Sequence, residues 1–265
     1  MNEKLKIADQ DNNSGAVASY TAAIYQDELV TLYNDDCLTV IDSLTPVDCV
    51  IIDPPYSSGT RQATNRSASN IPKRGEKWNK SGIIWDTSFS SFGLNQFMNV
   101  FYRKVKNVMN EGAHIYTFID WRQYPLLTMS IESAGLFINN LIVWDKGMYA
   151  LGGNYRSQHE LIVFASKGKA RELTNHSTGN VMDFKRVSGG DHPTEKPVDL
   201  ISKIIECATK EGQTVLDCFA GGGSSLLAAK NLGRRAVGIE IDKTYCELIK
   251  DRLNPMGKLG TMTAV

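Results

Sequence analysis

The sequence lacks the patterns that mark several classes of protein. It has only five cysteines in 265 residues, none of them in a Cys-x-x-Cys pair, and its four histidines show no metal-ligand spacing. We therefore expect a reduced, cytoplasmic environment with neither a disulfide framework nor a metal site. Apolar runs of membrane-spanning length are missing, and so is a signal-peptide pattern, so we expect no membrane association.

The sequence also lacks a net charge, with 29 basic and 29 acidic residues. A neutral chain does not by itself indicate a nucleic-acid partner. The charges are unevenly placed, however, because the segment 57–82 has only Glu76 as an acidic residue against six basic ones: Arg61, Arg66, Lys73, Arg74, Lys77 and Lys80. A polar segment without helix or strand periodicity predicts either a basic loop that binds phosphates or a solvated, disordered insertion.

Two common nucleotide-binding motifs are missing as well, the GxGxxG spacing of dinucleotide sites and the P-loop. The chain has instead an apolar strand that ends at Asp217, a glycine-rich turn at 221–223 and a helix over 224–232. Such a turn lets a ligand approach the backbone closely, or serves only for tight packing of strand and helix. A second strand, 236–239, ends at Glu240, at the position where comparable folds hold ribose hydroxyls.

The most informative segment present is Asp53-Pro54-Pro55-Tyr56, which directly follows the apolar run 49–52. The two prolines end the predicted strand because neither can donate a backbone hydrogen bond. An acidic side chain, a free carbonyl and an aromatic ring are thereby placed at the end of a strand. These groups suit a flat, amino-bearing ring, although an ordinary strand-terminating turn is the alternative interpretation.

Apolar strands alternate with helices along most of the chain, which predicts an α/β fold with a mainly parallel, doubly wound sheet. We expect strands at 29–33, 48–52, 113–119, 136–144, 161–165, 213–217 and 236–239, and helices at 37–44, 91–109, 122–133, 198–210, 224–232 and up to about 253. We divide the chain into an arm (1–27), a catalytic domain (28–253) and a tail (254–265). The catalytic domain contains a basic loop (57–84) and a target-recognition insertion (146–190).

Together these segments resemble the beta group of S-adenosylmethionine-dependent DNA amino-methyltransferases, in which the DPPY motif precedes the glycine loop. The segments 32–38 and 192–197 resemble the group's adenine-contacting segment and the segment before its first cofactor helix, although Asp35 replaces the group's usual glycine. The resemblance covers about residues 28–252. It implies a Rossmann-like methyltransferase fold with permuted motif order.

The resemblance implies methyl transfer from S-adenosylmethionine to the exocyclic N6 of an adenine that is flipped out of double-stranded DNA. The motif Asp53-Pro54-Pro55-Tyr56 would be catalytic, with the carboxylate and the Pro54 carbonyl accepting hydrogen bonds from the amine and Tyr56 stacking on the base. The aspartate favours adenine, because cytosine-N4 members often carry serine there. A cytosine-N4 enzyme is the first alternative, followed by an RNA methyltransferase and a silent DNA-binding regulator.

The resemblance also implies which residues bind the cofactor: Asp36, Cys37, Asp53, Thr194, Lys196, Asp217, Phe219, Ala220, Gly221, Gly223, Ser224, Glu240 and Ile241. Glu240 would hold the ribose hydroxyls, and Thr194 and Lys196 the cofactor carboxylate, unless these two form only a helix-leading turn. The expected DNA contacts are Arg61, Arg66, Lys73, Arg74, Lys77 and Arg156, although Arg156 pairs with Glu160 in the alternative interpretation. A homodimer and a cognate restriction endonuclease are the expected protein partners, in a bacterial or phage-infected cell.

Overall fold

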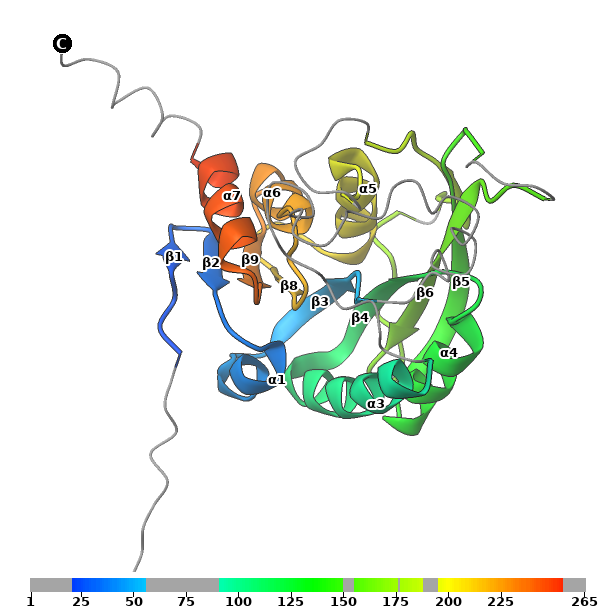
Figure 1. Cartoon of the computed structure of the whole chain (residues 1–265), viewed down its shortest axis with the longest axis horizontal. Coiled ribbons are helices and arrows are strands. Elements are labelled where there is room, and N and C mark those ends of the chain that lie inside the picture. The colour runs from blue at the N-terminus through cyan, green and yellow to red at the C-terminus, as the bar shows by residue number, and fades with distance from the viewer. Residues whose placement is uncertain (1–20, 56–90, 150–154, 176, 188–194, 255–265) are drawn as a thin grey trace, which may run out of the picture.

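The computed structural model describes residues 21–55, 91–149, 155–175, 177–187 and 195–254, which form a sheet of nine strands (Figure 1). The strand order across the sheet is β1-β2-β9-β8-β3-β4-β6-β5-β7. In chain order, the strands are β1 (Tyr25–Gln26), β2 (Val30–Tyr33), β3 (Val47–Ile52), β4 (Met109–Ile119), β5 (Phe137–Asp145), β6 (His159–Ser166), β7 (Val181–Asp183), β8 (Thr214–Asp217) and β9 (Arg235–Ile239).

The centre of the sheet is parallel. Strands β2, β9, β8, β3 and β4 all run in one direction, whereas β6 runs antiparallel to both β4 and β5, and β1 runs antiparallel to β2. The predicted α/β fold with a mainly parallel sheet is therefore confirmed. Because β6 is reversed, its first residue lies at the same edge of the sheet as the last residues of β3, β4 and β5.

Helices cover both faces of the sheet (Figure 1). The first face carries α1 (Cys37–Val40), the 3-10 turn η1 (Ile41–Ser43), α3 (Ser91–Val108) and α4 (Tyr124–Ser133), and the second carries α5 (Val198–Ala208), α6 (Ser224–Asn231) and α7 (Lys243–Leu253). Apolar side chains at helical spacing form the face of each helix that packs against the sheet. On α5 these side chains are Leu200, Ile201, Ile204 and Ile205. The result is a separate hydrophobic core on each side of the sheet.

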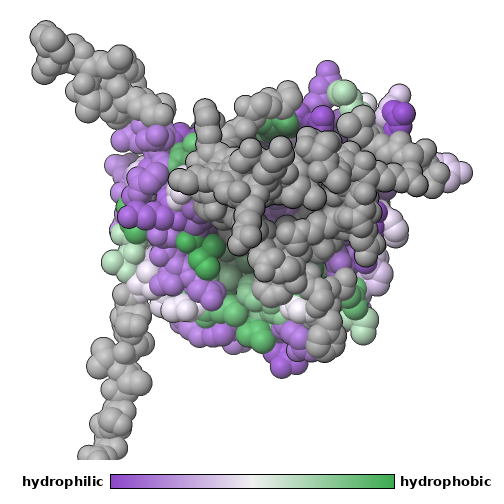
Figure 2. Space-filling model, viewed as in Figure 1, coloured by the Kyte–Doolittle hydropathy of each residue, from purple (hydrophilic) through white to green (hydrophobic). Residues whose placement is uncertain are grey.

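Local signals explain where several helices begin. Asp242 caps α7 by accepting a hydrogen bond from the Thr244 N–H at 2.7 Å, and Pro197 directly precedes α5. Hydrophilic residues cover the described surface of α7, on the left in Figure 2, and small hydrophobic groups lie near α1 and α3. None of the described helices has the length and apolar character that crossing a membrane requires.

The structure also differs from the prediction in detail. Strand β7 lies in the polar segment 167–191, where no strand was expected, and of its three residues only Met182 is buried. Strand β4 begins at Met109, so it follows α3 directly rather than starting at 113. Strand β1 lies within the segment 1–27 that was predicted to be an arm.

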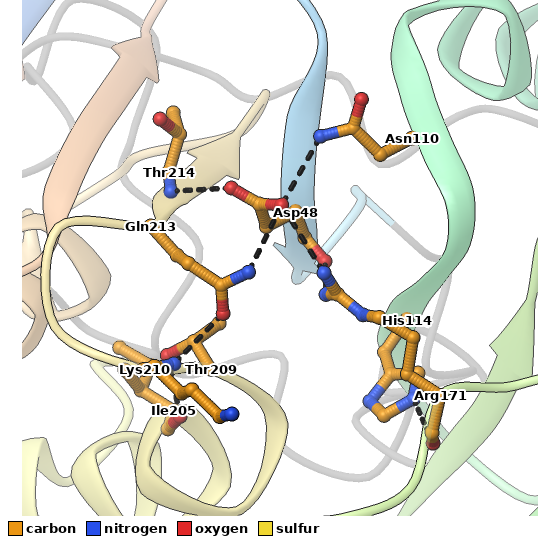
Figure 3. Close-up of polar contacts among 9 residues, drawn as sticks. All are labelled: Asp48, Asn110, His114, Arg171, Ile205, Thr209, Lys210, Gln213 and Thr214. Carbon is orange, nitrogen blue, oxygen red and sulfur yellow. Dashed lines mark hydrogen bonds and ion pairs between the residues drawn. The ribbon is translucent and has the colours of Figure 1, made fainter.

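A polar network ties the strands together at the amino end of β3 (Figure 3). Asp48 Oδ1 accepts hydrogen bonds from Asn110 Nδ2 at 3.1 Å, Arg171 Nη1 at 3.1 Å and Gln213 Nε2 at 3.2 Å. Its Oδ2 accepts one from the Thr214 N–H at 3.0 Å. One carboxylate thus links β3 to β4, to β8 and to the segment after β6, at the sheet edge opposite to Asp53.

Candidate active site

The two segments singled out in the sequence follow neighbouring parallel strands. Strand β3 pairs with β8 through Cys49↔Val215 and Val50↔Leu216, so Asp217 at the end of β8 and Asp53 directly after β3 lie at the carboxyl ends of paired strands. Ligand sites of open α/β sheets form at this edge. Strand β9 pairs with β8 on its other side, which brings Glu240 to the same edge.

The turn after β3 carries the Asp53 carboxylate, of which one oxygen has a hydrogen-bond partner among the described residues and the other has none. Asp53 Oδ2 accepts a hydrogen bond from Lys196 Nζ. Asp53 Oδ1 is buried and has no hydrogen-bond partner among the described residues. Since a buried acceptor normally finds a donor, this oxygen indicates the place of a ligand N–H. Pro54 is also buried, and Tyr56 lies outside the described residues.

A chain of charged side chains leads away from Asp53. Lys196 Nζ lies 3.5 Å from Glu160 Oε1, and Glu160 Oε2 lies 3.0 Å from Lys146 Nζ. The side chains of Lys196 and Glu160 are only 8% and 11% exposed. Lys196 Nζ also lies 5.2 Å from the centre of the Phe118 ring. Buried charges are tolerated only when they are paired, as they are here.

These contacts shift the ionisation of the pair. Burial raises the pKa of Asp53 to about 6, with Lys196 opposing this effect and Glu160 reinforcing it. Burial acts to lower the pKa of Lys196, but the carboxylates of Asp53 and Glu160 outweigh it and raise the pKa above its usual value. Lys196 is therefore a cation near neutral pH, and Asp53 changes its charge within the physiological range.

The glycine loop after β8 has a conformation that requires glycine. Gly223 has φ +77°, and a Cβ atom there would lie 2.9 Å from Ile249 Cγ1. Asp217 accepts hydrogen bonds from the Phe219 N–H at 2.9 Å and from the Ser225 hydroxyl, and burial raises the pKa of Asp217 to about 7. The loop is thus closed onto its own strand and helix, and at Gly223 it packs directly against the Ile249 side chain of α7, with no room for a Cβ atom.

Glu240 holds this loop from the end of β9. Its Oε2 accepts a hydrogen bond from the Gly221 N–H at 2.7 Å, and its Oε1 accepts one from the Asp242 N–H at 2.9 Å. Glu240 is 4% exposed, and burial raises its pKa. Because a carboxylate has about four acceptor positions, two further hydrogen bonds from a ligand are compatible with this arrangement.

The segment after β2 lies beside Glu240. Strand β2 pairs with β9 through Tyr33↔Ile239, and Asn34 Nδ2 donates to the Glu240 carbonyl at 2.9 Å. Asp36 caps α1 by accepting from the Leu38 N–H at 2.8 Å, while the Ile241 side chain is 60% exposed. An exposed apolar side chain beside a helix start suits the face and edge of a purine, so the residues fit an adenosyl group.

Arg252 and Glu195, which were not predicted as site residues from the sequence, link the glycine loop to the segment before α5. Arg252 Nη1 donates to the Gly222 carbonyl at 2.7 Å, and its Nη2 lies 2.6 Å from Glu195 Oε1. Ser224 Oγ lies 3.3 Å from the same glutamate oxygen. Helix α7 thereby fastens the glycine loop to the segment that carries Lys196. An arginine in the last turn of a helix is so common that the sequence offers no signal for this link.

The predicted site residues separate into three groups. Asp53, Asp217 and Glu240 meet at one sheet edge, together with most of the predicted cofactor residues. Arg156 lies apart from Asp53 in its contacts, with its guanidinium 5.0 Å from the centre of the Tyr149 ring, whereas Glu160 pairs with Lys146 and Lys196. The remaining predicted residues lie outside the described part of the chain: Tyr56, Arg61, Arg66, Lys73, Arg74, Lys77 and Thr194.

Comparison with known proteins assigns the site to a family. A family model described as DNA methylase, N6_N4_Mtase, matches residues 47–251, a span that contains Asp53, Lys196, Asp217 and Glu240. The chain belongs to this DNA methylase family. The predicted family resemblance is thereby confirmed, and the chain is a DNA methyltransferase of the class that acts on N6 or N4 amines.

Relatives of this methylase align over most of its length. It is 28% identical over 256 residues to the type II methyltransferase M2.DpnII of Streptococcus pneumoniae, covering 88% of this chain and 92% of the relative. It is 27% identical over 263 residues to the type II methyltransferase M2.LlaDCHI of Lactococcus lactis subsp. cremoris, covering 91% and 95%.

Solved structures share the fold of this methylase. The M1.HpyAVI–SAM complex has a TM-score of 0.62 at 24% identity and covers 84% of this chain and all of that one. The PvuII DNA methyltransferase, described as cytosine-N4-specific, has a TM-score of 0.68 at 14% identity and covers 87% and 88%. The predicted methyltransferase fold is confirmed.

Proposed function

We propose that this methylase transfers a methyl group from S-adenosylmethionine to the exocyclic N6 of adenine, at a specific sequence in double-stranded DNA. The observation that carries the proposal is the buried Oδ1 of Asp53 at the carboxyl end of β3, which has no hydrogen-bond partner among the described residues. An acceptor in this position suits the N–H of an amine. A base inside a duplex cannot reach it, so the target base is flipped out.

The chemistry follows from the poor nucleophilicity of an amine whose lone pair is delocalised into the ring. Asp53 Oδ1 and the Pro54 carbonyl accept hydrogen bonds from the amine and so shift electron density onto its nitrogen as it attacks. Tyr56 stacks on the base. The cofactor supplies an electrophilic sulfonium methyl group, and the protein accelerates the reaction largely by holding the amine in line with it.

The cofactor is held by residues that meet at the edge formed by β2, β8 and β9. Glu240 accepts hydrogen bonds from the ribose hydroxyls, Asp36, Cys37 and Ile241 contact the adenine, and Asp217 with the backbone of 219–224 lines the methionine portion. The solved M1.HpyAVI–SAM complex, which has the same fold, supports this choice of cofactor. Thr194 and Lys196 remain candidates for the cofactor carboxylate.

Adenine is preferred to cytosine because of the aspartate at the head of the DPPY motif. The second candidate is cytosine-N4 methylation, which the shared fold of the cytosine-N4-specific PvuII enzyme favours. The basic segment 57–84 and Arg156 are proposed to bind DNA phosphates, and 146–190 to read the sequence. A homodimer and a partner endonuclease are proposed partners, the latter because M2.DpnII and M2.LlaDCHI are described as type II methyltransferases.

The test is single-molecule sequencing of DNA from a methylation-free host that expresses the wild-type chain, Asp53→Ala or Asp53→Asn. We expect N6-methyladenine in one short motif, its absence with Asp53→Ala, and similar cofactor dissociation constants for all three proteins by calorimetry. Detection of N4-methylcytosine instead would show that the target base is cytosine and not adenine. Normal methylation by Asp53→Ala would remove the role of Asp53, and an unmodified genome with intact cofactor binding would favour an RNA substrate or a silent regulator.

A further inference from the structure

We propose that Glu160 is a positioning residue for methyl transfer, which acts by holding the Lys196 ammonium against Asp53. The proposal rests on the function proposed above, because it concerns the carboxylate that receives the target amine. It gives Lys196 a role on the catalytic carboxylate, in place of the predicted role on the cofactor carboxylate.

The strand that carries Glu160 holds this residue more rigidly than the segment before α5 holds Lys196. Glu160 is fixed in a strand that is paired on both sides, opposite Trp144 of β5, one residue before the pairing of Leu161 with Ile119 of β4. Lys196 lies in the segment leading into α5, where no strand pairing fixes it. A long lysine side chain has large rotamer freedom, so its ammonium needs partners to stay in one place. Glu160 is the rigidly mounted partner.

The charges of the side chains around Asp53 balance one another. Two carboxylates, Asp53 and Glu160, alternate with two ammonium groups, Lys196 and Lys146. If Lys196 moved away to a cofactor carboxylate, Asp53 and Glu160 would be left as neighbouring anions in a largely buried site. Leaving a buried charge uncompensated is strongly destabilising. This cost favours a Lys196 that stays between the two carboxylates.

The contact with Lys196 also orients the Asp53 carboxylate. Lys196 engages Oδ2, which leaves Oδ1 as the buried oxygen that lacks a partner among the described residues. Lys196 thus fixes Oδ2 and leaves Oδ1 oriented to accept a hydrogen bond from the target amine. Without Lys196 in place the carboxylate can rotate, and a displacement of about 1 Å at the reacting group is enough to cost roughly 100-fold in rate.

The proposal predicts that Glu160→Gln and Lys196→Met shift the pH profile of kcat in the same direction, because loss of Glu160 releases the Lys196 ammonium from Asp53. Lys196 favours the ionised form of Asp53 and Glu160 disfavours it, and both effects act on a pKa of about 6. Lys146 after β5 also lowers the pKa of Asp53, and further carboxylates at this edge are Asp120 after β4, Asp217 at the end of β8 and Glu240 after β9. Because the carboxylate form accepts the amine hydrogens, activity falls as the pH drops through the pKa of Asp53.

The experiment measures kcat against pH at saturating DNA and cofactor for the wild type, Glu160→Gln and Lys196→Met. We expect the acid limb to move to higher pH in both variants, by about 1 unit in Lys196→Met and by less in Glu160→Gln, because the direct effect of Glu160 on the pKa of Asp53 is opposite to that of Lys196 and smaller. Both variants lose about 10- to 100-fold in kcat at the plateau. The dissociation constant for S-adenosylmethionine, measured by calorimetry, stays within about 2-fold, which also shows that each variant is folded.

Matched controls are Glu247→Gln and Lys250→Met, which make the same changes in an ion pair of 2.9 Å on α7, where the Glu247 side chain is 59% exposed. These variants keep the wild-type profile. Lys196→Arg keeps the charge and restores the position of the acid limb. If Lys196→Met does not fold, Lys146→Met tests the same chain of charges from its more exposed end, and its acid limb moves to higher pH.

Two results would overturn the inference. One is an acid limb that stays in place in both variants, or that moves to lower pH in Glu160→Gln, which would show that Lys196 stays on Asp53 without Glu160. The other is a large loss of cofactor affinity in Lys196→Met with kcat retained at saturating cofactor, which would assign Lys196 to the cofactor alone. A wild-type protein that methylates no DNA would be a failure of the proposed function and is recognised before any variant is compared.

Discussion

Replacement of Glu240 by alanine is expected to weaken cofactor binding, even though this carboxylate already has partners within the protein. Its two oxygens accept hydrogen bonds from the Gly221 N–H at 2.7 Å and the Asp242 N–H at 2.9 Å. The Glu240→Ala variant leaves both N–H groups without their acceptor and frees the loop of residues 221–223 at one anchor. It also removes the acceptor proposed for the ribose hydroxyls.

The magnitude follows from the contacts. A hydrogen bond to a charged group contributes about 1.5–3 kcal/mol. If the free energy of one such bond is lost from cofactor binding, the dissociation constant rises roughly 10- to 150-fold, because about 1.4 kcal/mol corresponds to a factor of ten. Glu240→Gln keeps one carbonyl acceptor but turns an amide NH₂ toward the second N–H, so its effect is expected to fall between wild type and alanine.

The assay is isothermal titration of S-adenosylmethionine into the wild type, Glu240→Ala and Glu240→Gln, with the exposed Glu247→Ala on α7 as the control. Thermal denaturation without cofactor separates loss of fold from loss of affinity. An alanine variant that melts near the wild type and binds the cofactor within about 2-fold would refute both the loop-anchoring and the ribose roles.

Two further predictions concern the fold. In Gly238→Ala, the new Cβ would lie 2.5 Å from Leu226 Cδ1, so we expect a loss of about 1–3 kcal/mol in the free energy of unfolding in urea, and an unchanged midpoint would contradict the packing described for α6 on β9. In Asp48→Ala, four donors lose their acceptor (Figure 3), so we expect a loss of about 2–4 kcal/mol in thermal unfolding with kcat of the folded enzyme preserved. A smaller loss in Asp48→Asn is the control, and a loss in alanine below about 0.5 kcal/mol would show that water replaces the network.

Much of the fold could be predicted because its elements follow local rules. Strand β3 is a continuous apolar run stopped by two prolines, and α6 begins directly after a glycine with positive φ. Such signals depend on neighbouring residues alone. Strand β7 was missed for the same reason, since a three-residue strand with one buried side chain has no periodicity to detect. Its pairing with β5 is a property of the tertiary fold.

The placement of the two predicted loops could also be inferred, because parallel strands bring their carboxyl ends to one edge. To predict that Asp53 and Asp217 lie close together, it was enough that β3 and β8 both belong to the parallel part of the sheet. The contact between Lys196 and Asp53, which are 143 residues apart, required more. The segment 192–197 resembles a cofactor motif, but its sequence is equally compatible with Lys196 directed to the cofactor or to the catalytic turn.

The position of Glu160 depends on the direction of a single strand. Strand β6 runs antiparallel between β4 and β5, so its first residues lie beside the last residues of its neighbours, where Asp53 is also found. In a fully parallel sheet the same sequence would place Glu160 at the opposite edge, near Asp48, and Lys196 would face Asp53 alone. Periodicity identifies a buried strand at 161–165 but is the same for both directions, since side chains alternate in either case. The reversal of β6 is therefore the feature of the fold that completes the chain of charges at the active site, and it is the feature that local sequence signals contain least information about.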